Sequence, residues 1–469
     1  MLPWTYKSFN VKSIKDNNLA QLFYQSQSSD TGFRVLSCTI KVSGLTDGQG
    51  IEYISNGTQP TVIMRIENDG IYHLPSFDFG AKNAYYGFRF LKLQESCNIT
   101  IEQLPLYPGF ILGDGVDDFA VTEKELNFED TYTVYTAFIP FQNNPTRNMI
   151  LCGADSKKTF SMQYSFLVYV SFIAGNNYYI NADFVNGLNL FACKRNGNNI
   201  CIKNLLTNKV VTGTCGDWVE NAGLYYLWKN ATYASFAKAA IAGQTICNGY
   251  FSTDEDDEKV LNWYKKQYPW LFPDQAWTVV GKTNEDEDRA TIANITGNGN
   301  DLVCLNLGFI EGSGYNEEGE YAGYLVTDGV DDKITSSTFE MGNDWTVIGD
   351  WELINTGKND NAGIVKFDSI VIYNYNPILI NIKNGRNNLI PDQNTVNAIC
   401  SDGRIYSKDW KESIYNEETE STSKNFLTIG YSGNVYTKIA FKNLAIYPTV
   451  LSREDCIKAY NYLQTLKAK

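Results

Sequence analysis

The chain has 469 residues, a length typical of roughly two to four domains, and a formal net charge of −14. Phosphate contacts need a basic surface, so this acidic composition argues against a nucleic-acid binder, and the absence of any run of about 18 apolar residues argues against a membrane-spanning segment. Aromatic residues make up 14% of the chain, which favours sheets because flat side chains suit a pleated, half-buried surface. We therefore predict an all-β fold.

Ten cysteines are spread along the chain without paired short spacings. A disulfide framework or a zinc site normally shows clustered cysteines, so we interpret them as mostly reduced, buried thiols. The first residues, 1–7, lack the charged start and the long apolar core of a signal peptide. These features predict a protein that is made in a cytoplasm.

The N-terminal part of the chain predicts a small β-sandwich. Residues 1–32 are polar and irregular, and we predict one short helix at 14–24 within them. Short apolar runs separated by turns rich in Gly, Asn and Asp follow from Phe33, and this spacing is typical of a sandwich. The predicted strands are 35–42, 61–66, 88–93 and 98–101. Pro105 and Pro108 cannot lie inside a paired central strand, so we place a boundary after residue 104 and expect 1–104 to be an attachment module.

One motif occurs twice, at residues 109–118 and 323–332. In both copies alternating apolar residues lead into Asp-Gly-Val-Asp-Asp, a pattern typical of a strand that enters a tight turn. A second predicted strand follows each copy at nearly the same distance, at 132–138 and at 345–351. Internal repetition of this kind predicts two related β domains, which span 105–272 and 273–469.

Both predicted domains end in a short helix. Ser252 and Thr253 precede a run of acidic residues, and acids in a first turn favour a helix start because they interact with its exposed N–H groups. Ser452 occupies the same place in the second domain, after a predicted closing strand at 439–447, and the helix is predicted from 456 to about 466. Within the first domain, the apolar run 164–170 predicts a buried strand.

The order of features in the second domain resembles the LamG-type, concanavalin A-like lectin/glucanase family. A Gly-Asn-Gly-Asn turn at 297–300 precedes a strand, then come Asp-Gly-Val-Asp-Asp, a Trp-Thr-Val strand, a closing strand and a capped helix. The resemblance covers 277–466 well and 109–265 less well, because the first copy lacks the Gly-Asn-Gly-Asn lead-in. It implies two concanavalin A-like jelly-roll sandwiches, each with a short C-terminal helix, after the small N-terminal sandwich. The pairing of the lead-in segment at 281–302 with the motif at 325–332 is similar to virion surface proteins, such as head or tail fibres, of tailed phages of gut bacteria, including the crAss-like group.

Few residues offer catalytic chemistry. His73 is the only histidine, so a Ser-His-Asp or Cys-His site in either repeat would have to take it from another domain, and a histidine-rich metal site is excluded by count. Glycoside hydrolysis needs only two carboxylates, and enzymes of the similar superfamily carry them alternating along one strand face. The acidic runs at 253–258 and 284–289 are continuous, which is typical of a helix start or a solvated loop. We expect a protein that is not an enzyme, with no catalytic residues and no organic cofactor.

The repeated aspartates allow two interpretations. Clustered carboxylates suit calcium, which takes oxygen ligands. The alternative is turn chemistry, in which the aspartates bond their own backbone while Gly115 and Gly329 supply positive φ. Turn chemistry is favoured, because no stretch offers the six or more oxygens of a full calcium ligand set. The candidate calcium ligands are Asp114, Asp117, Asp118, Asp328, Asp331 and Asp332.

Four aromatic residues in loop-like segments are candidates for stacking on sugar rings. Such residues more often belong to a core or an interface, and both interpretations stay open for each of them. The four candidates are Trp218, Trp228, Tyr406 and Trp410.

These features favour a non-enzymatic virion surface protein, a head or tail fibre or a decoration protein, whose lectin-like domains serve adhesion to host-surface glycans or particle assembly. The expected partners are other virion proteins and host glycans, with no nucleic acid and no membrane insertion, in a homo-oligomer that is a dimer or a trimer. The expected location is the virion surface after synthesis in the host cytoplasm. The alternatives are a glycan-binding module of a bacterial cell-surface protein, which would need an export signal, and a glycoside hydrolase, which would need paired carboxylates.

Overall fold

The computed structural model describes most of the chain between Ser8 and Ala468, with gaps. The described residues are 8–12, 19–25, 34–35, 38–46, 48–56, 60–74, 77–78, 85–91, 98–104, 107–114, 119–141, 148–153, 160–165, 167–173, 178–183, 185, 187–219, 222–227, 238–354, 362–367, 370–374, 378–382, 386–390, 396–407, 410, 412–414, 427–432 and 435–468.

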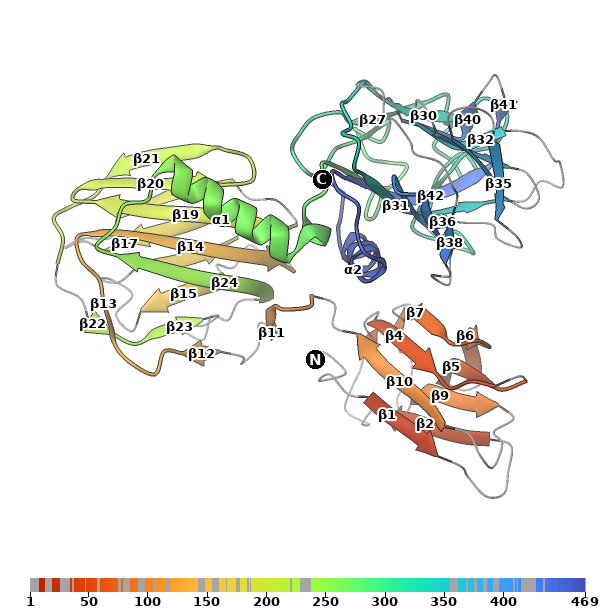
Figure 1. Cartoon of the computed structure of the whole chain (residues 1–469), viewed down its shortest axis with the longest axis horizontal. Helices are drawn as coiled ribbons and strands as arrows, with labels where there is room; N and C mark the ends of the chain where they lie inside the picture. Colours follow the sequence, from red (N-terminus) through yellow and green to blue (C-terminus); the bar gives the residue numbers. More distant parts are fainter. Residues whose placement is uncertain are drawn as a thin grey trace. The chain divides into compact units, whose positions relative to one another are not determined.

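The fold is all-β with short helices, as predicted (Figure 1). The chain divides into two compact units. Unit 1 comprises residues 1–108 together with 406–412, and unit 2 comprises 109–405 together with 413–469. In the described part of the chain, neither α-helix is long and apolar enough to cross a membrane.

Unit 1 contains the predicted small sandwich. One antiparallel sheet has the order β1 (Ser8–Lys12), β10 (Asn98–Leu104), β4 (Cys38–Ser43) and β7 (Gly70–Leu74). The other has the order β2 (Leu19–Gln25), β9 (Tyr85–Leu91), β5 (Gly50–Asn56) and β6 (Pro60–Ile66), and β3 (Arg34–Val35) pairs with β8 (Phe77–Asp78). Apolar residues from both sheets, such as Ile40 and Ile99 on one and Ile51 and Phe90 on the other, form one core.

The helix predicted at 14–24 is wrong where the structure describes it. Residues 19–25 form β2, which pairs with β9 over its full length from Leu19 to Gln25. Helix propensity is only a weak preference, and backbone pairing with a neighbouring strand overrides it here. Residues 14–18 lie outside the described residues.

The first sandwich of unit 2 has two six-stranded antiparallel sheets. One has the order β11 (Ile111–Asp114), β24 (Lys238–Asn248), β14 (Thr131–Pro140), β19 (Asn189–Asn196), β20 (Asn199–Asn204) and β21 (Val210–Thr214). The other has the order β12 (Ala120–Val121), β23 (Tyr225–Leu227), β15 (Asn148–Gly153), β16 (Ser161–Tyr164), β17 (Val168–Phe172) and β18 (Tyr178–Ala182), and β13 (Leu126–Asn127) pairs with β22 (Ala222–Gly223). One core joins the sheets through residues such as Phe138 and Phe191 on the first and Tyr164 and Phe172 on the second.

The single buried strand predicted at 164–170 is wrong. The segment contains a turn between β16 and β17, which pair antiparallel with Tyr164 opposite Val168, and Ser165 N donates to Leu167 O. A continuous apolar run does not reveal a tight turn when both strands on either side of it face the same core.

The second sandwich, which belongs to unit 2 except for residues 406–412, also has two antiparallel sheets. One has the order β28 (Gly314–Asn316), β29 (Tyr324–Val326), β42 (Ile439–Tyr447), β31 (Thr346–Leu353), β36 (Val396–Cys400), β37 (Arg404–Ser407) and β38 (Glu412–Ile414), with β25 (Gln275–Thr278) also paired to β42. The other has the order β26 (Thr291–Ile292), β27 (Leu302–Leu305), β30 (Lys333–Ser336), β39 (Thr428–Ile429), β32 (Ala362–Phe367), β33 (Ile370–Asn374), β34 (Ile378–Ile382) and β35 (Arg386–Ile390), and β40 (Tyr431–Ser432) pairs with β41 (Val435–Tyr436). Trp277, Trp351 and Phe441 lie in its core with Leu302 and Ile334 of the facing sheet.

Both predicted helix caps are confirmed. Helix α1 (Asp254–Gln267) begins with a capping box, in which the side chains of Thr253 and Asp256 each accept from the backbone N–H of the other residue. Helix α2 (Arg453–Leu463) begins at Ser452, whose Oγ accepts from Asp455 N at 3.1 Å, three residues earlier than predicted. The short 3₁₀ helix η1 (Pro269–Leu271) follows α1 and is largely buried.

The two sandwiches meet inside unit 2 around Tyr462 of α2. Its hydroxyl accepts a hydrogen bond from Leu188 N of the first sandwich at 3.0 Å, and its ring packs edge-on against Trp270 of η1 with centroids 5.9 Å apart. Tyr447 of β42 donates to Trp270 O at 3.0 Å. The division into domains 105–272 and 273–469 stays a prediction, since both sandwiches belong to one compact unit.

We expect the substitution Gly187→Ala to weaken this junction. A Cβ at residue 187 would lie 2.5 Å from the Tyr462 hydroxyl oxygen, so Tyr462 would have to leave the position in which it binds Leu188 N. Overpacking of this kind lowers the free energy of unfolding by about 1–3 kcal/mol, which chemical denaturation would measure. Gly342→Ala is the control, because nothing lies within 4 Å of its Cβ position. Equal stability of the two variants would contradict this role of Gly187.

Candidate functional site

A cleft of about 560 Å³ lies between the two sandwiches of unit 2. Its first wall comes from the segments that flank β19 and β20, with Leu188, Leu206 and Thr207, and from the end of α1. The segment 269–274 crosses the cleft from one sandwich to the other. Its second wall comes from the second sandwich, with Thr296, Asn298, Thr449, Tyr462, Leu466 and Lys467.

The Gly-Asn-Gly-Asn turn shapes the second wall. Gly297 and Gly299 adopt φ of 83° and 75°, values that favour glycine because it has no Cβ to clash. Thr296 Oγ1 and Asn298 Nδ2 both donate to Asp274 O, at 3.1 and 2.8 Å, and so hold the turn against the segment that crosses the cleft. The motif that marked the second domain in the sequence therefore lines this cleft.

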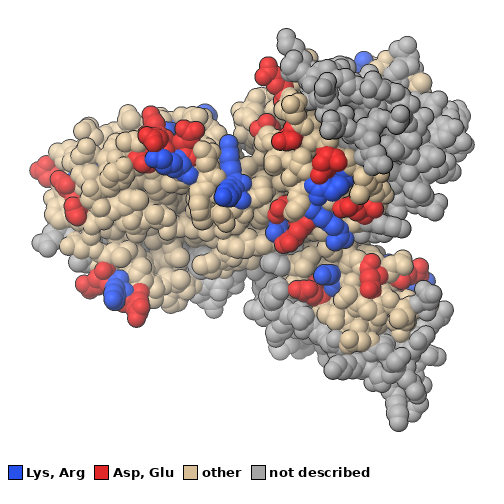
Figure 2. Space-filling model, viewed as in Figure 1, with Lys and Arg blue, Asp and Glu red and all other residues tan. Residues whose placement is uncertain are grey.

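The cleft combines an apolar interior with a basic rim. Leu188, Leu271 and Leu466 are buried, whereas Lys265 and Lys266 in the last turn of α1 are exposed. Lys467 is a third exposed cation on the lining. Figure 2 shows acidic side chains at the start of α1 and basic ones farther along it, in agreement with the charges of its first and last turns.

Asp274 is the one acidic residue on this lining. Loss of solvent around its carboxyl raises its pKa, and the nearby Lys265 opposes that rise. The lining therefore offers three cations against one carboxylate, although the whole chain is acidic. A ligand with negative charge would be attracted to this rim.

The structure places the second copy of the aspartate motif in a tight turn. Asp328 Oδ1 accepts from Val330 N at 2.7 Å, and Gly329 has φ of 78°, which is the turn chemistry expected from the sequence. One oxygen from each of Asp328, Asp331 and Asp332 lies within 4.8 Å of the others. The three candidate ligands of this copy therefore come together.

The first copy is described only in part. Asp114 is the last residue of β11, and nothing further is described of its side chain. Asp117 and Asp118 lie outside the described residues. His73 lies on β7 opposite Thr39, and its side chain is not among those described.

Two of the four aromatic candidates are buried, as the core or interface interpretation requires. Tyr406 is 0% and Trp410 is 3% exposed, so neither ring presents a face to a sugar in this structure. Trp218 is partly buried and packs against the core of the first sandwich. Trp228 lies outside the described residues. Aromatic residues in short polar segments can lie at the surface or in the core, because burial depends on tertiary packing that local sequence does not report.

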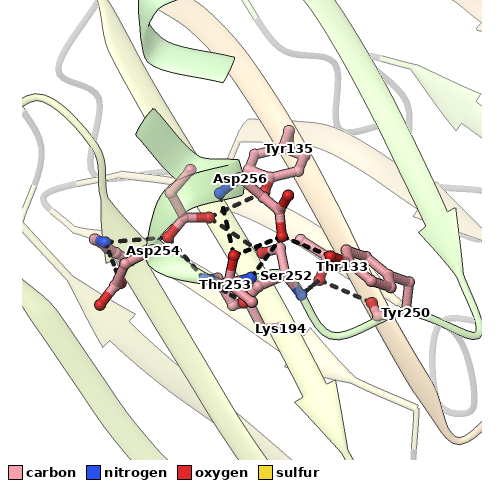
Figure 3. A network of polar contacts seen from close by, with 10 residues as sticks. Thr133, Tyr135, Lys194, Tyr250, Ser252, Thr253, Asp254 and Asp256 are labelled. Carbon is pink, nitrogen blue, oxygen red and sulfur yellow. Dashed lines mark hydrogen bonds and ion pairs between the residues drawn. The ribbon is translucent and has the colours of Figure 1, made fainter. Parts of the chain in front are cut away.

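The acidic run 253–258 is a helix start, as expected, but one of its members is buried. Asp257 of α1 is 2% exposed and contacts Tyr135 of β14, Lys194 of β19 and Lys203 of β20. Figure 3 shows the surrounding polar network, with Tyr135, Lys194 and Ser252 among its labelled residues. Asp257 Oδ2 pairs with Lys194 Nζ at 2.7 Å and with Lys203 Nζ at 3.1 Å. Its Oδ1 accepts from the hydroxyls of Tyr135 and Ser252, at 2.9 and 3.1 Å.

Both carboxylate oxygens of Asp257 have partners in this network, and the network is enclosed by protein. Lys194 Nζ also donates to Ser252 O at 3.0 Å, and its side chain is 5% exposed. Burial raises the pKa of Tyr135 and so keeps its hydroxyl protonated as a donor. The arrangement anchors α1 on the sheet, and sequence reasoning missed it because a continuous acidic run does not reveal which carboxylate points inward.

The other acidic run, 284–289, forms a turn region as expected. Asn284 holds it to the second sandwich, with Oδ1 accepting from Tyr315 N and Nδ2 donating to Tyr315 O, both at 2.8 Å. Lys282 Nζ pairs with Asp288 at 2.8 Å. The run therefore serves as a fixed loop on the described surface.

Strand β31 carries two acidic residues at alternating positions, which is the spacing of the carboxylates in glycoside hydrolases of the similar superfamily. Asp350 and Glu352 point to the same side of the strand, separated by the core residue Trp351. Asp350 accepts from Tyr324 Oη at 3.1 Å and from Gln464 Nε2 at 3.0 Å, and Lys442 Nζ lies 3.7 Å away. These contacts give Asp350 a role in holding the segment after α2 on the sheet.

No protein-family model matches the chain, and a search of curated proteins finds no match. Among solved structures, the binding domain of Paraclostridial Mosquitocidal Protein 1 is 11% identical over 70% of this chain and 86% of its own, with a TM-score of 0.31. The binding domain of botulinum neurotoxin DC in complex with SialylT is 10% identical over 72% of this chain and 99% of its own, with a TM-score of 0.28. A Trypanosoma rangeli sialidase is 8% identical over 64% of this chain and 60% of its own, with a TM-score of 0.31. At these values the likenesses carry no argument about function.

We expect Asp257→Asn to destabilise the first sandwich. The substitution leaves Lys194 buried with its charge uncompensated, and breaking a buried ion pair in this way costs roughly 3–5 kcal/mol of unfolding free energy. Chemical denaturation would measure the loss, and hydrogen exchange would show whether α1 opens first. Glu258→Gln, at the neighbouring exposed position of the same helix, serves as the matched control. A loss below about 1 kcal/mol would show that the pair does not anchor α1.

Proposed function

We propose that this chain is a non-enzymatic carbohydrate-binding protein and that unit 2 holds an acidic glycan in the cleft between its sandwiches. The observation that carries the proposal is the cleft itself, with its buried leucines and its rim of three lysines. Ligand sites are typically concave and mostly apolar, with a few polar groups that fix orientation. This cleft has that composition.

The polar groups of the lining suit a sugar. Thr207 supplies a hydroxyl and Asn298 its amide oxygen, which can exchange hydrogen bonds with sugar hydroxyls, whereas Thr296 Oγ1 and Asn298 Nδ2 are engaged with Asp274 O. Phe272, which is partly buried, and the buried leucines offer apolar surface for the C–H face of a sugar ring. The volume of about 560 Å³ falls within the range of roughly 300–1,000 Å³ that is usual for small-ligand sites.

The lysines select the class of glycan. Lys265, Lys266 and Lys467 favour a sugar that carries carboxylate or sulfate groups, because ammonium groups bind such anions as point charges. The net charge of −14 disfavours binding of polyanions elsewhere on the surface, so the attraction is local to this rim. Uronic or other acidic sugars fit this description better than neutral ones.

The setting that we propose is the surface of a virion, where many weak sites act together. The sequence resemblance to fibre and decoration proteins of tailed phages motivates it, with unit 1 as the attachment module and unit 2 as the adhesive part. Multivalent display would convert weak binding at each cleft into firm adhesion. Assembly with other virion proteins through the same unit is the alternative that the glycan experiment tests.

The test is an acidic-glycan array with the purified full chain, followed by calorimetry on the glycans that bind. We expect the double substitution Lys265→Glu and Lys266→Glu to weaken binding by about tenfold or more, a loss of about 1.4 kcal/mol. Binding by the unsubstituted chain should also weaken as salt is raised from about 0.05 to 0.5 M.

Lys259→Glu is the matched control, because Lys259 lies on the same helix, is exposed and does not line the cleft. It should bind as the unsubstituted chain does. Absence of binding to every acidic glycan would refute the proposed function and favour assembly. If the double substitution Lys265→Glu and Lys266→Glu leaves glycan binding unchanged, the glycan site lies outside the cleft.

A further inference from the structure

The Asp-Gly-Val-Asp-Asp turn of the second sandwich has a feature that turn chemistry does not explain. Asp332 is 0% exposed, and both hydrogen bonds to its carboxylate go to the same oxygen. Ser313 Oγ and Asp328 N each donate to Oδ2 at 2.8 Å. The other oxygen, Oδ1, is buried and accepts no hydrogen bond. Buried polar atoms are nearly always partnered, so this oxygen calls for a ligand.

Two further carboxylates surround the same place. Asp328 and Asp331 each bring an oxygen within 4.8 Å of one from Asp332 and of each other. Asp331 is exposed and Asp328 is partly exposed, so the cluster opens to solvent on one side. A ligand could therefore reach the buried Asp332 past these two residues.

The negative charges of the cluster have no basic side chain as a counter-ion in the part of the chain that the structure describes. None of the ion pairs between described residues involves Asp328, Asp331 or Asp332. Lys282, a buried lysine of the same sandwich, is paired with Asp288 instead. Three carboxylates this close repel one another unless a cation joins them.

We propose that this turn binds a calcium ion, with the buried Oδ1 of Asp332 as its innermost ligand and the carboxylates of Asp328 and Asp331 beside it. Calcium takes six to eight oxygens in irregular arrangements, so backbone carbonyls and water complete the set, whereas magnesium demands near-ideal octahedral geometry. The three side-chain ligands are all carboxylates, which suits calcium better than zinc.

The ion would tie two loops of the sandwich together. Asn306 Nδ2 donates to Asp331 O at 3.0 Å, and Ser313 Oγ links Asp332 Oδ2 to Gly308 N, so the loop between β27 and β28 already borders the turn. Val330 and Ile310, at the tips of these loops, are 72% and 65% exposed. A cation that joins the carboxylates would stabilise the folded state by mass action, because the unfolded chain lacks the site.

The experiment uses the full chain, stripped of metal with chelator and titrated with calcium chloride. Calorimetry should show binding with a Kd of roughly 10⁻⁴ to 10⁻³ M, the weak end of the range of protein calcium sites. Thermal unfolding should shift upward by about 2–6 °C at about 10 mM calcium, with a smaller shift for magnesium.

Asp331→Ala is the decisive variant, because its exposed side chain can be removed without disturbing the core. It should lose one equivalent of bound calcium, or bind it at least about tenfold more weakly, while its unfolding temperature without metal does not fall. Asp344→Ala, another exposed aspartate of the same sandwich outside the cluster, should behave as the unsubstituted chain does.

Either of two results would overturn the proposal. The first is no calcium-dependent heat and no shift of the unfolding temperature in the unsubstituted chain. The second is calcium binding by Asp331→Ala with the original affinity and stoichiometry. Neither result bears on the cleft, which is tested separately by the glycan experiment.

Discussion

The contact between Tyr462 and the first sandwich is the interaction on which the candidate site depends. Tyr462 belongs to the last helix, yet its hydroxyl accepts from Leu188 N and its ring packs on Trp270 of the connecting segment. Tyr447 fixes Trp270 from the closing strand. Because these aromatic groups hold both sandwiches against the segment 269–274, the space beside them becomes a cleft with walls from both. A cleft formed in this way requires the whole of unit 2, and neither sandwich alone would provide it.

The Asp-Gly-Val-Asp-Asp turn of the second sandwich both stabilises a loop and contains the residues of the proposed cation site. Asp328 closes the turn on Val330 N, and Asp332 joins that turn to Ser313 of the neighbouring loop. Two donors on one oxygen of Asp332 leave the other oxygen without a partner in the protein. The same arrangement that stabilises the loop therefore creates the position at which a cation would complete the set of contacts.

Prediction from sequence failed where burial had to be inferred for a single side chain. Asp257 and its exposed neighbour Glu258 look alike in an acidic run, but only Asp257 faces Lys194 and Lys203 beneath α1. Tyr406 and Trp410 lie among polar residues and are nevertheless buried. Residues 19–25 form a strand because β9 offers a pairing edge, which no local propensity reports. In each case the deciding partner lies far away in the sequence.

The sequence by itself determined the class of the fold, the small N-terminal sandwich and the caps of both helices. Alternating apolar residues, Gly and Asn turns and Ser or Thr caps act over a few residues, so their effect can be read locally. Only the tertiary structure decided that α1, the Gly-Asn-Gly-Asn turn and the final helix border one cleft, and that Asp332 carries a buried, unpartnered oxygen. Those features arise from contacts between residues as distant as Leu188 and Tyr462, which depend on how the completed sheets pack.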